Sequence, residues 1–270
     1  MSKLLSMIKS SEKPVIGMVQ LDPLPGSSRH TTGGVNRILD RAFEEADTLV
    51  TNGVDVLMVQ NLGDLPVAAA AAAPQVACMT RVVTEVLGRF GLPVGINLLE
   101  NDAEAMIAVA SAAGADFVRI KVYVGAMLTP FGVESGQAYA AIRARNACDA
   151  HNVAIFADVH DRTGVPLATG GFAEDFDHAL RLGGADGVVL TGKSYSETLE
   201  LVAAARKLNP DAAILVGGGV NAANIAEVTR VADGVIVSSA LKESGGPFGR
   251  FAPAKVSAFM EEAKRARAMR

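Results

Sequence analysis

The sequence predicts an α/β protein whose single domain is a (β/α)8 barrel, the TIM-barrel fold. Short apolar runs rich in Val and Ile alternate with amphipathic helical stretches along the whole chain. The runs are almost continuously hydrophobic, which is typical of parallel strands that helices cover on both faces. Eight such units fit into the 270 residues, and a barrel of this kind takes about 250.

A doubly wound open sheet is the alternative architecture. That fold rarely uses eight units of so regular a period, and no G-x-G-x-x-G pattern follows the first apolar run. We therefore expect one barrel domain over residues 1–270, without an internal boundary. Residues 1–12 are expected to form a short helix that caps the bottom of the barrel, residues 13–252 the eight βα units, and residues 253–270 the C-terminal helix.

The individual elements follow from hydrophobic periodicity and from helix punctuation. Asn101 and Ser196 are expected to act as N-caps. The peptides at residues 113–118, 183–189 and 231–237 are variants of one helix-to-strand connection, a weak internal repeat. The expected strands are residues 15–19, 54–59, 94–96, 117–122, 154–159, 187–190, 214–216 and 234–237. The expected helices are residues 35–49, 76–87, 102–112, 137–147, 174–182, 197–207, 222–231 and 253–266.

Composition excludes several classes of protein. Lys and Arg number 25 against 29 Asp and Glu, so no basic excess indicates a nucleic-acid partner. The longest uncharged apolar stretch, residues 65–79, falls short of the ~20 residues of a membrane span. The N-terminus has no secretory h-region, and Cys78 and Cys148 form neither a disulfide framework nor a metal motif. We expect a cytoplasmic protein without membrane insertion. Weakly charged helices at residues 76–87 and 109–113 favour a homo-oligomer.

A ring of polar residues falls at the expected C-terminal strand ends. In a TIM barrel the chemistry takes place at those ends, and an apolar core does not require such a ring. We assign substrate binding to the polar residues of the first, second, third and sixth strand ends. These are Gln20, Asp22, Asn61, Asn97 and Thr191.

The strongest local signal for a ligand lies after the last two strands. Gly217, Gly218 and Gly219 follow the seventh strand, and Ser238 and Ser239 follow the eighth. Barrel enzymes often bind phosphate with these two loops, because glycines let backbone N–H groups approach an anion. The sequence therefore predicts a phosphate site here; a tight turn that merely needs glycine is the alternative.

Asp158 and His160 end the fifth strand and are two residues apart, so we expect them on one face. They could exchange protons with a substrate, or the carboxylate could hold the imidazole in place in a purely structural role. One His and one Asp make at most half a metal site. A divalent metal at this position is therefore not favoured, and no cofactor is expected.

Three basic residues complete the candidate site. Lys121 and Lys193 could each form a Schiff base if desolvated, or could bind an anionic group as a point charge. Arg119 shares a strand face with Lys121 and could also form an internal ion pair with Asp158. Long loops at residues 21–34, 123–136, 160–171 and 242–251 are expected to act as lids or binding surfaces.

Several blocks of the sequence resemble the BtpA family. They are residues 17–27 (GMVQLDPLPGS), 118–122 (VRIKV), 125–129 (GAMLT), 156–160 (FADVH), 216–220 (VGGGV) and 233–242 (DGVIVSSALK). The resemblance spans essentially the whole chain and implies a TIM barrel. The founding member is linked to photosystem I accumulation, whereas SgcQ-like relatives accompany carbohydrate genes and carry labels such as nucleosidase. Lys121 and Lys193 depart from the common pattern and look more like the SgcQ-like branch.

Together these observations favour an enzyme that acts on a small phosphorylated metabolite, either a sugar phosphate or a nucleoside- or nucleotide-like compound. Asp158 and His160 would transfer protons, while Lys121 and Arg119 would stabilise negative charge. Isomerase or epimerase, lyase and nucleosidase-like hydrolase chemistry stay open. One alternative is Schiff-base aldol chemistry through Lys193 or Lys121. Another is a non-enzymatic assembly or stability factor, as in photosystem I biogenesis.

Overall fold

Eight parallel strands close into a barrel in the computed structural model, which describes residues 1–168 and 170–269. In chain order the barrel strands are β1 (Val15–Gln20), β2 (Val56–Gln60), β3 (Val94–Asn97), β4 (Phe117–Ile120), β7 (Ala154–Asp158), β9 (Gly187–Leu190), β10 (Ile214–Gly217) and β11 (Gly234–Val237). Around the barrel they follow the order β1-β11-β10-β9-β7-β4-β3-β2. The predicted (β/α)8 barrel is confirmed.

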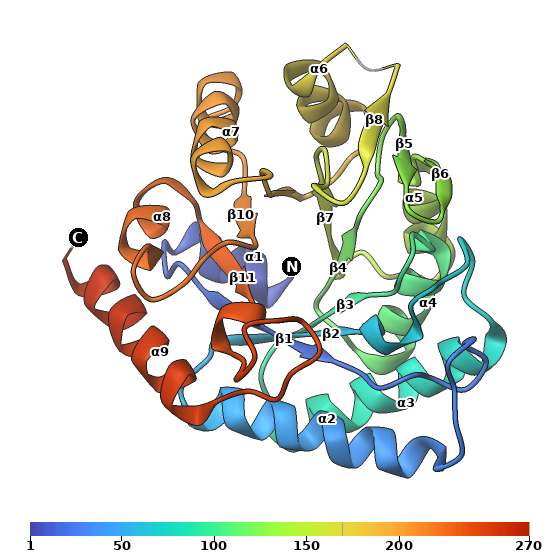
Figure 1. Ribbon diagram of the computed structural model, residues 1–270. Coiled ribbons are helices and arrows are strands. Elements are labelled where there is room, and N and C mark those ends of the chain that lie inside the picture. Colours follow the sequence, from blue (N-terminus) through green and yellow to red (C-terminus); the bar gives the residue numbers. More distant parts are fainter. Residues whose placement is uncertain (169, 270) are drawn as a thin grey trace.

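Helices surround the barrel (Figure 1). They are α1 (Lys3–Lys9), α2 (Gly34–Thr51), α3 (Ala73–Phe90), α4 (Ala103–Ala113), α5 (Ala138–Ala147), α6 (Phe172–Asp177), α7 (Tyr195–Leu208), α8 (Ile225–Val231) and α9 (Pro253–Ala268). A π-helical turn, His178–Leu182, extends α6. Within the described ranges, no helix is both long and apolar enough to cross a membrane. Arg270, the end of the predicted last helix, lies outside the described residues.

The two predicted N-caps are displaced by one or two residues in the structure. Asp102, not Asn101, caps α4, because its carboxylate accepts the N–H of Ala105. Ser194, not Ser196, caps α7. In both cases several residues capable of capping stand close together. Packing of the chain against the barrel decides which of them becomes the N-cap, the last residue before the helical backbone begins.

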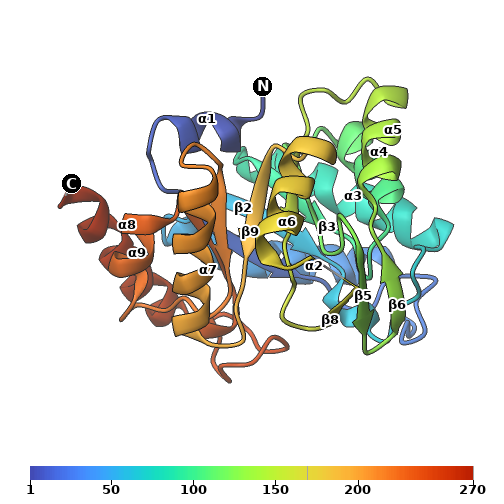
Figure 2. The ribbon, with the colours of Figure 1, turned by 90° about the horizontal axis from the view of Figure 1, so that it is seen from above.

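Alternation along the strands divides the apolar side chains between two cores. One set points into the barrel and includes Ile16, Met58, Phe117 and Phe156, and the other packs beneath the surrounding helices. Leu4 of α1 is fully buried against the inner set and closes the barrel at its N-terminal end, as the sequence predicted. Figure 2 shows α1 at one end of the barrel and the chain's additional strands at the other.

Those additional strands form a small antiparallel sheet where the sequence predicted only loops. Strands β5 (Ala126–Thr129), β6 (Gly132–Ser135) and β8 (Val165–Leu167) pair in the order β6-β5-β8. Each strand is three or four residues long, and β8 is far from β5 and β6 in the sequence. Periodicity cannot reveal strands this short, because cross-strand pairing rather than local pattern stabilises them. Thr169, within the predicted loop 160–171, lies outside the described residues.

Candidate functional site

The C-terminal ends of the barrel strands surround one cavity of about 450 Å³. Polar and apolar side chains both line it, and the apolar ones include Leu62, Leu65, Pro130 and Phe131. Ten of the predicted site residues line it. They are Gln20, Asn97, Arg119, Lys121, Asp158, Thr191, Gly217, Gly218, Ser238 and Ser239.

A chain of hydrogen bonds runs across five neighbouring strand ends, those of β11, β1, β2, β3 and β4. The Ser238 hydroxyl donates to Gln20 Oε1 over 3.0 Å, and Gln20 Nε2 donates to Gln60 Oε1 over 3.3 Å. Gln60 Nε2 continues to Asn97 Oδ1 over 2.5 Å, and Asn97 Nδ2 reaches the carbonyl of Arg119 over 2.9 Å. The amide groups are therefore held in fixed orientations toward the cavity. Such an array suits recognition of hydroxyl groups.

Gln60 was missed by the sequence analysis, which chose its neighbour Asn61. Gln60 is the direct register partner of Gln20 in the adjacent strand. The signal was available, because inward-facing positions recur at every second residue. Asn61 points away from the cavity and is fully buried. It donates to Asp64 over 2.8 Å and accepts the N–H of Leu99 over 2.7 Å.

Arg119 and Asp158 form a two-pronged ion pair at the floor. Arg119 Nε and Nη2 each lie 2.7 Å from a carboxylate oxygen of Asp158. The side chain of Asp158 is 1% exposed. Burial raises the pKa of Asp158 to about 6, although Arg119 opposes the shift. A carboxyl group that titrates near neutral pH in a cavity is suited to proton transfer.

The second cation of the floor is also paired. Lys121 Nζ forms a buried ion pair with Glu100. Asp161 lies between the two cations, 3.9 Å from Arg119 Nη2 and 4.0 Å from Lys121 Nζ. Burial, with the nearby charge of Glu100, raises the pKa of the neighbouring Glu134. The positive charges of Arg119 and Lys121 are therefore largely balanced by carboxylates of the chain itself.

The loops after β10 and β11 lie on the same side of the cavity. Gly218 and Gly219 have φ values of 103° and 75°, a backbone conformation that favours glycine. The hydroxyl of Thr191 donates to the carbonyl of Gly217. Ser239 begins a single 3₁₀ turn, Ser239–Leu241, directly after β11. This arrangement is compatible with the predicted phosphate site, which stays a prediction.

Four predicted site residues lie outside the cavity lining besides Asn61. Lys193 is exposed, and its backbone N–H donates to Glu197 over 2.6 Å. Gly219 is exposed at the far side of its turn, and Asp22 lines two smaller surface pockets. His160 lines an adjoining pocket, which shares Lys121 and Asp158 with the main cavity.

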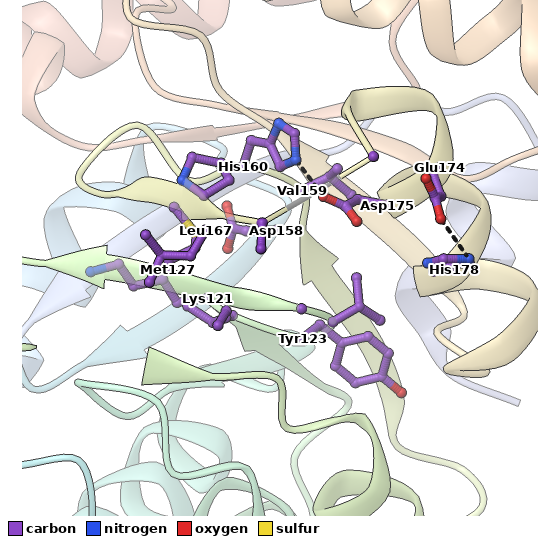
Figure 3. A pocket seen from close by; sticks show the side chains of 17 residues that line it. Lys121, Tyr123, Met127, Asp158, Val159, His160, Leu167, Glu174, Asp175 and His178 are labelled. Carbon is purple, nitrogen blue, oxygen red and sulfur yellow. Dashed lines mark hydrogen bonds and ion pairs between the residues drawn. The ribbon is translucent and has the colours of Figure 1, made fainter. Parts of the chain in front are cut away.

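Figure 3 shows this second pocket, whose volume is about 180 Å³. His160 has a φ of 58°, which breaks the strand alternation directly after Asp158. Its Nε2 atom lies 2.6 Å from a carboxylate oxygen of Asp175. Asp158 and His160 therefore have different partners, Arg119 in the barrel mouth and Asp175 on α6, although both residues line this second pocket.

Other side chains that line this pocket, Tyr123, Glu174 and His178, also contact neighbouring residues of the chain. The Tyr123 hydroxyl donates to the carbonyl of Gly183 over 2.5 Å, and burial raises its pKa to about 12. Glu174 lies 3.8 Å from His178, also drawn in Figure 3. Over residues 1–168 and 170–269, no three His, Cys, Asp or Glu side chains are grouped to hold a metal ion.

The fold and this cavity define a TIM-barrel protein with a cavity at the C-terminal ends of its strands. The chain belongs to the BtpA family, whose sequence profile matches residues 11–265. It is similar to the Photosystem I biogenesis protein BtpA of Synechocystis, with 37% identity over 257 residues, covering 93% of this chain and 88% of the relative.

Solved structures support the fold at much lower identity. Tryptophan synthase of Mycobacterium tuberculosis superposes with a TM-score of 0.62 and 16% identity, covering 98% of each chain. N-(5'-phosphoribosyl)anthranilate isomerase of Pyrococcus furiosus superposes with a TM-score of 0.55 and 17% identity, covering 94% of this chain and 99% of that one. These similarities establish the barrel architecture alone.

Proposed function

We propose that this protein is an enzyme that binds a small phosphorylated metabolite, a sugar phosphate or nucleotide-like compound, in the barrel mouth. The observation that carries the proposal is the division of one cavity into two parts. Gly217, Gly218, Ser238 and Ser239, at the ends of the neighbouring strands β10 and β11, line one part. The floor holds the amide chain and the buried carboxyl of Asp158. A phosphate would occupy the first part and the reacting carbon the second.

Asp158 is the proton-transfer group of the proposed reaction. Its pKa of about 6 lets the carboxyl both accept and return a proton near neutral pH. Gln20, Gln60 and Asn97 would orient substrate hydroxyls beside it. Isomerisation or epimerisation needs only these parts, and they would also serve a lyase or a nucleosidase-like hydrolase. His160 faces the adjoining pocket and would act on the substrate only from there.

Schiff-base chemistry is less well supported. Lys193 is exposed and outside the cavity lining. Lys121 is inside, but its amino group is committed to the ion pair with Glu100. Nucleophilic attack on a carbonyl needs an amine with a free lone pair.

One observation favours a second candidate, an assembly or stability factor. Leu128 lies directly opposite Val133 on one side and Val165 on the other, and all three side chains are exposed. An exposed apolar row of this kind can serve as a protein-binding surface. Asp158→Asn, which keeps the size of the side chain, distinguishes the two functions, because an assembly factor should keep its partner and an enzyme should lose turnover.

The proposed function predicts stabilisation by phosphorylated ligands. In a thermal-shift screen with inorganic phosphate, sugar phosphates and nucleoside monophosphates at matched ionic strength, a true ligand at 100 times its Kd stabilises by about 2.7 kcal/mol. Ser239→Glu should abolish the shift, because it places a negative charge in the cavity wall. Ser196→Glu, on an exposed turn of α7, adds the same charge and should leave the shift intact. Absence of any shift in the wild type would contradict the proposal.

Anion binding is expected to depend on pH through Asp158. Below about pH 6 its carboxyl is neutral, so Arg119 attracts a bound anion more strongly. Affinity for sulfate, which stays doubly charged, should fall as the pH rises above 6, by up to about tenfold per unit. Asp158→Asn should flatten the profile, whereas His160→Gln should leave it. An unchanged slope in Asp158→Asn would assign the titration to another group.

A further inference from the structure

We infer that Arg162, which the sequence analysis did not select, is the residue that pairs with the anionic group of the ligand. This inference rests on the proposed function, because it names the cation of the same cavity. Arg162 follows β7 by four residues and is exposed at the cavity wall.

Charge balance singles out Arg162. The cavity is lined by three cations and three carboxylates: Arg119, Lys121, Arg162, Glu100, Asp158 and Asp161. Arg119 pairs with Asp158 and Lys121 with Glu100, while Asp161 lies within 4.0 Å of both. Among the residues that the structure describes, no carboxylate lies within ion-pair distance of Arg162. The three cations and three carboxylates balance overall, but among the described residues Arg162 is the cation of this lining without a carboxylate in ion-pair contact. It is therefore the cation that could pair with an incoming anion without first giving up a partner.

The guanidinium group lies beside the glycine turn. A Cβ atom built on Gly218 would be 3.5 Å from Arg162 Cζ and 3.5 Å from its Nη2 atom. The same position is 3.4 Å from the Thr191 methyl group. The glycine turn and the arginine therefore border one small space. A phosphate oxygen there could accept hydrogen bonds from guanidinium N–H groups, in the two-pronged geometry that Arg provides and Lys does not.

The loop that carries Arg162 is anchored to the cavity floor. Asp161 is buried, and its Oδ1 atom accepts the N–H of Thr163 over 2.9 Å. Its carbonyl accepts the N–H of Gly164 over 3.2 Å. The turn is thus held by its own hydrogen bonds and by the attraction of Asp161 to the floor cations. A fixed turn reduces the entropy that Arg162 loses when it closes on a ligand.

The expected ligand is a phosphate monoester of a hydroxylated carbon chain. Its phosphate would lie between Arg162 and the Gly218 turn, and its hydroxyls would reach toward Gln20 and Gln60, which line the same cavity. A phosphate presents several oxygens and can satisfy the arginine and the backbone N–H groups at the same time. An uncharged sugar would leave Arg162 without a partner.

The test compares anion affinity in four proteins. Isothermal titration with inorganic phosphate and with ribose 5-phosphate is carried out on the wild type, Arg162→Gln, Arg162→Lys and Arg230→Gln. Loss of a hydrogen-bonded charge should weaken binding of both probes by about 10- to 100-fold in Arg162→Gln. Arg162→Lys should be intermediate. Arg230 lies exposed on α8, so its change to Gln removes the same charge and should leave the affinity unchanged.

The outcomes separate this inference from the function on which it rests. If the wild type binds phosphate and Ser239→Glu abolishes binding, but Arg162→Gln binds as tightly as the wild type, the assignment of Arg162 is overturned and the phosphate cavity stands. If the wild type binds neither probe, the proposed function fails and the inference with it. An equal loss in Arg230→Gln would show that net charge, not the position of Arg162, governs affinity, and would also overturn the assignment.

Discussion

Asp158→Ala is expected to lower the free energy of unfolding by about 3–5 kcal/mol, the usual cost of removing one partner from a buried ion pair. The substitution leaves the guanidinium of Arg119 beneath the cavity with its side chain only 13% exposed. Asp161 is the next carboxylate, at 3.9 Å, and makes no comparable two-pronged contact. Urea denaturation measures the change, with the slope of the transition checked against the wild type.

A surface pair provides the matched control. Glu104 pairs with Arg143, and their side chains are 58% and 48% exposed. Glu104→Ala should cost at most about 1 kcal/mol, because water screens the charge that remains. Replacing both floor partners, Arg119→Met with Asp158→Ala, should recover part of the loss, since the buried guanidinium is removed together with its partner. Equal costs for the buried and the exposed carboxylate would contradict this account of the floor.

Gly95→Ala is expected to destabilise the barrel by about 3 kcal/mol, at the upper end of the range for overpacked cores. The added Cβ would lie 2.1 Å from Phe117 Cζ, inside the barrel. Phe117 is fully buried and packs edge-on against Phe156, with ring centroids 5.8 Å apart, so the ring has no free space to enter. Thermal and urea unfolding of the purified variant would give the cost.

A rescue variant and a control variant test whether the clash with the Phe117 ring causes the destabilisation. Phe117→Leu removes the ring atoms that the new methyl would meet, so Gly95→Ala should cost much less in that background. Gly88 lies in α3, and nothing is within 4 Å of a Cβ built on it. Gly88→Ala should therefore stabilise by about 0.5–1 kcal/mol through helix propensity. Additive effects of Gly95→Ala and Phe117→Leu would show that the two residues do not compete for space.

Much of the floor of the candidate site could be predicted from residue spacing. Arg119 and Lys121 lie two apart, and Gln20, Asn97 and Asp158 each end a buried apolar run. In a closed parallel barrel every such end meets the same rim, so the cavity lining follows once the strands are located. The same reasoning could have identified Gln60, but the prediction placed the inward-facing residue one position too late, at Asn61.

The structure altered the prediction where the chain leaves the strands. His160 stands two residues after Asp158, yet its positive φ turns the ring toward Asp175 on α6. The sheet of β5, β6 and β8 forms from segments that local pattern assigns to loops. Arg162 gains significance only because the turn around Asp161 brings it beside Gly218, which is more than fifty residues away in sequence.

The sequence by itself determined the barrel, the order of its units and the ring of polar strand ends, because these depend on periodicities of two and 3.6 residues that local composition enforces. The sequence offered the ion pair of Arg119 with Asp158 only as one option, and tertiary structure decided which polar groups neutralise one another. Arg119 and Lys121 have carboxylate partners that come from other strands and loops, and Arg162 has none among the described residues. Charge pairing depends on distances of a few ångströms across the fold, and spacing along the chain does not encode them.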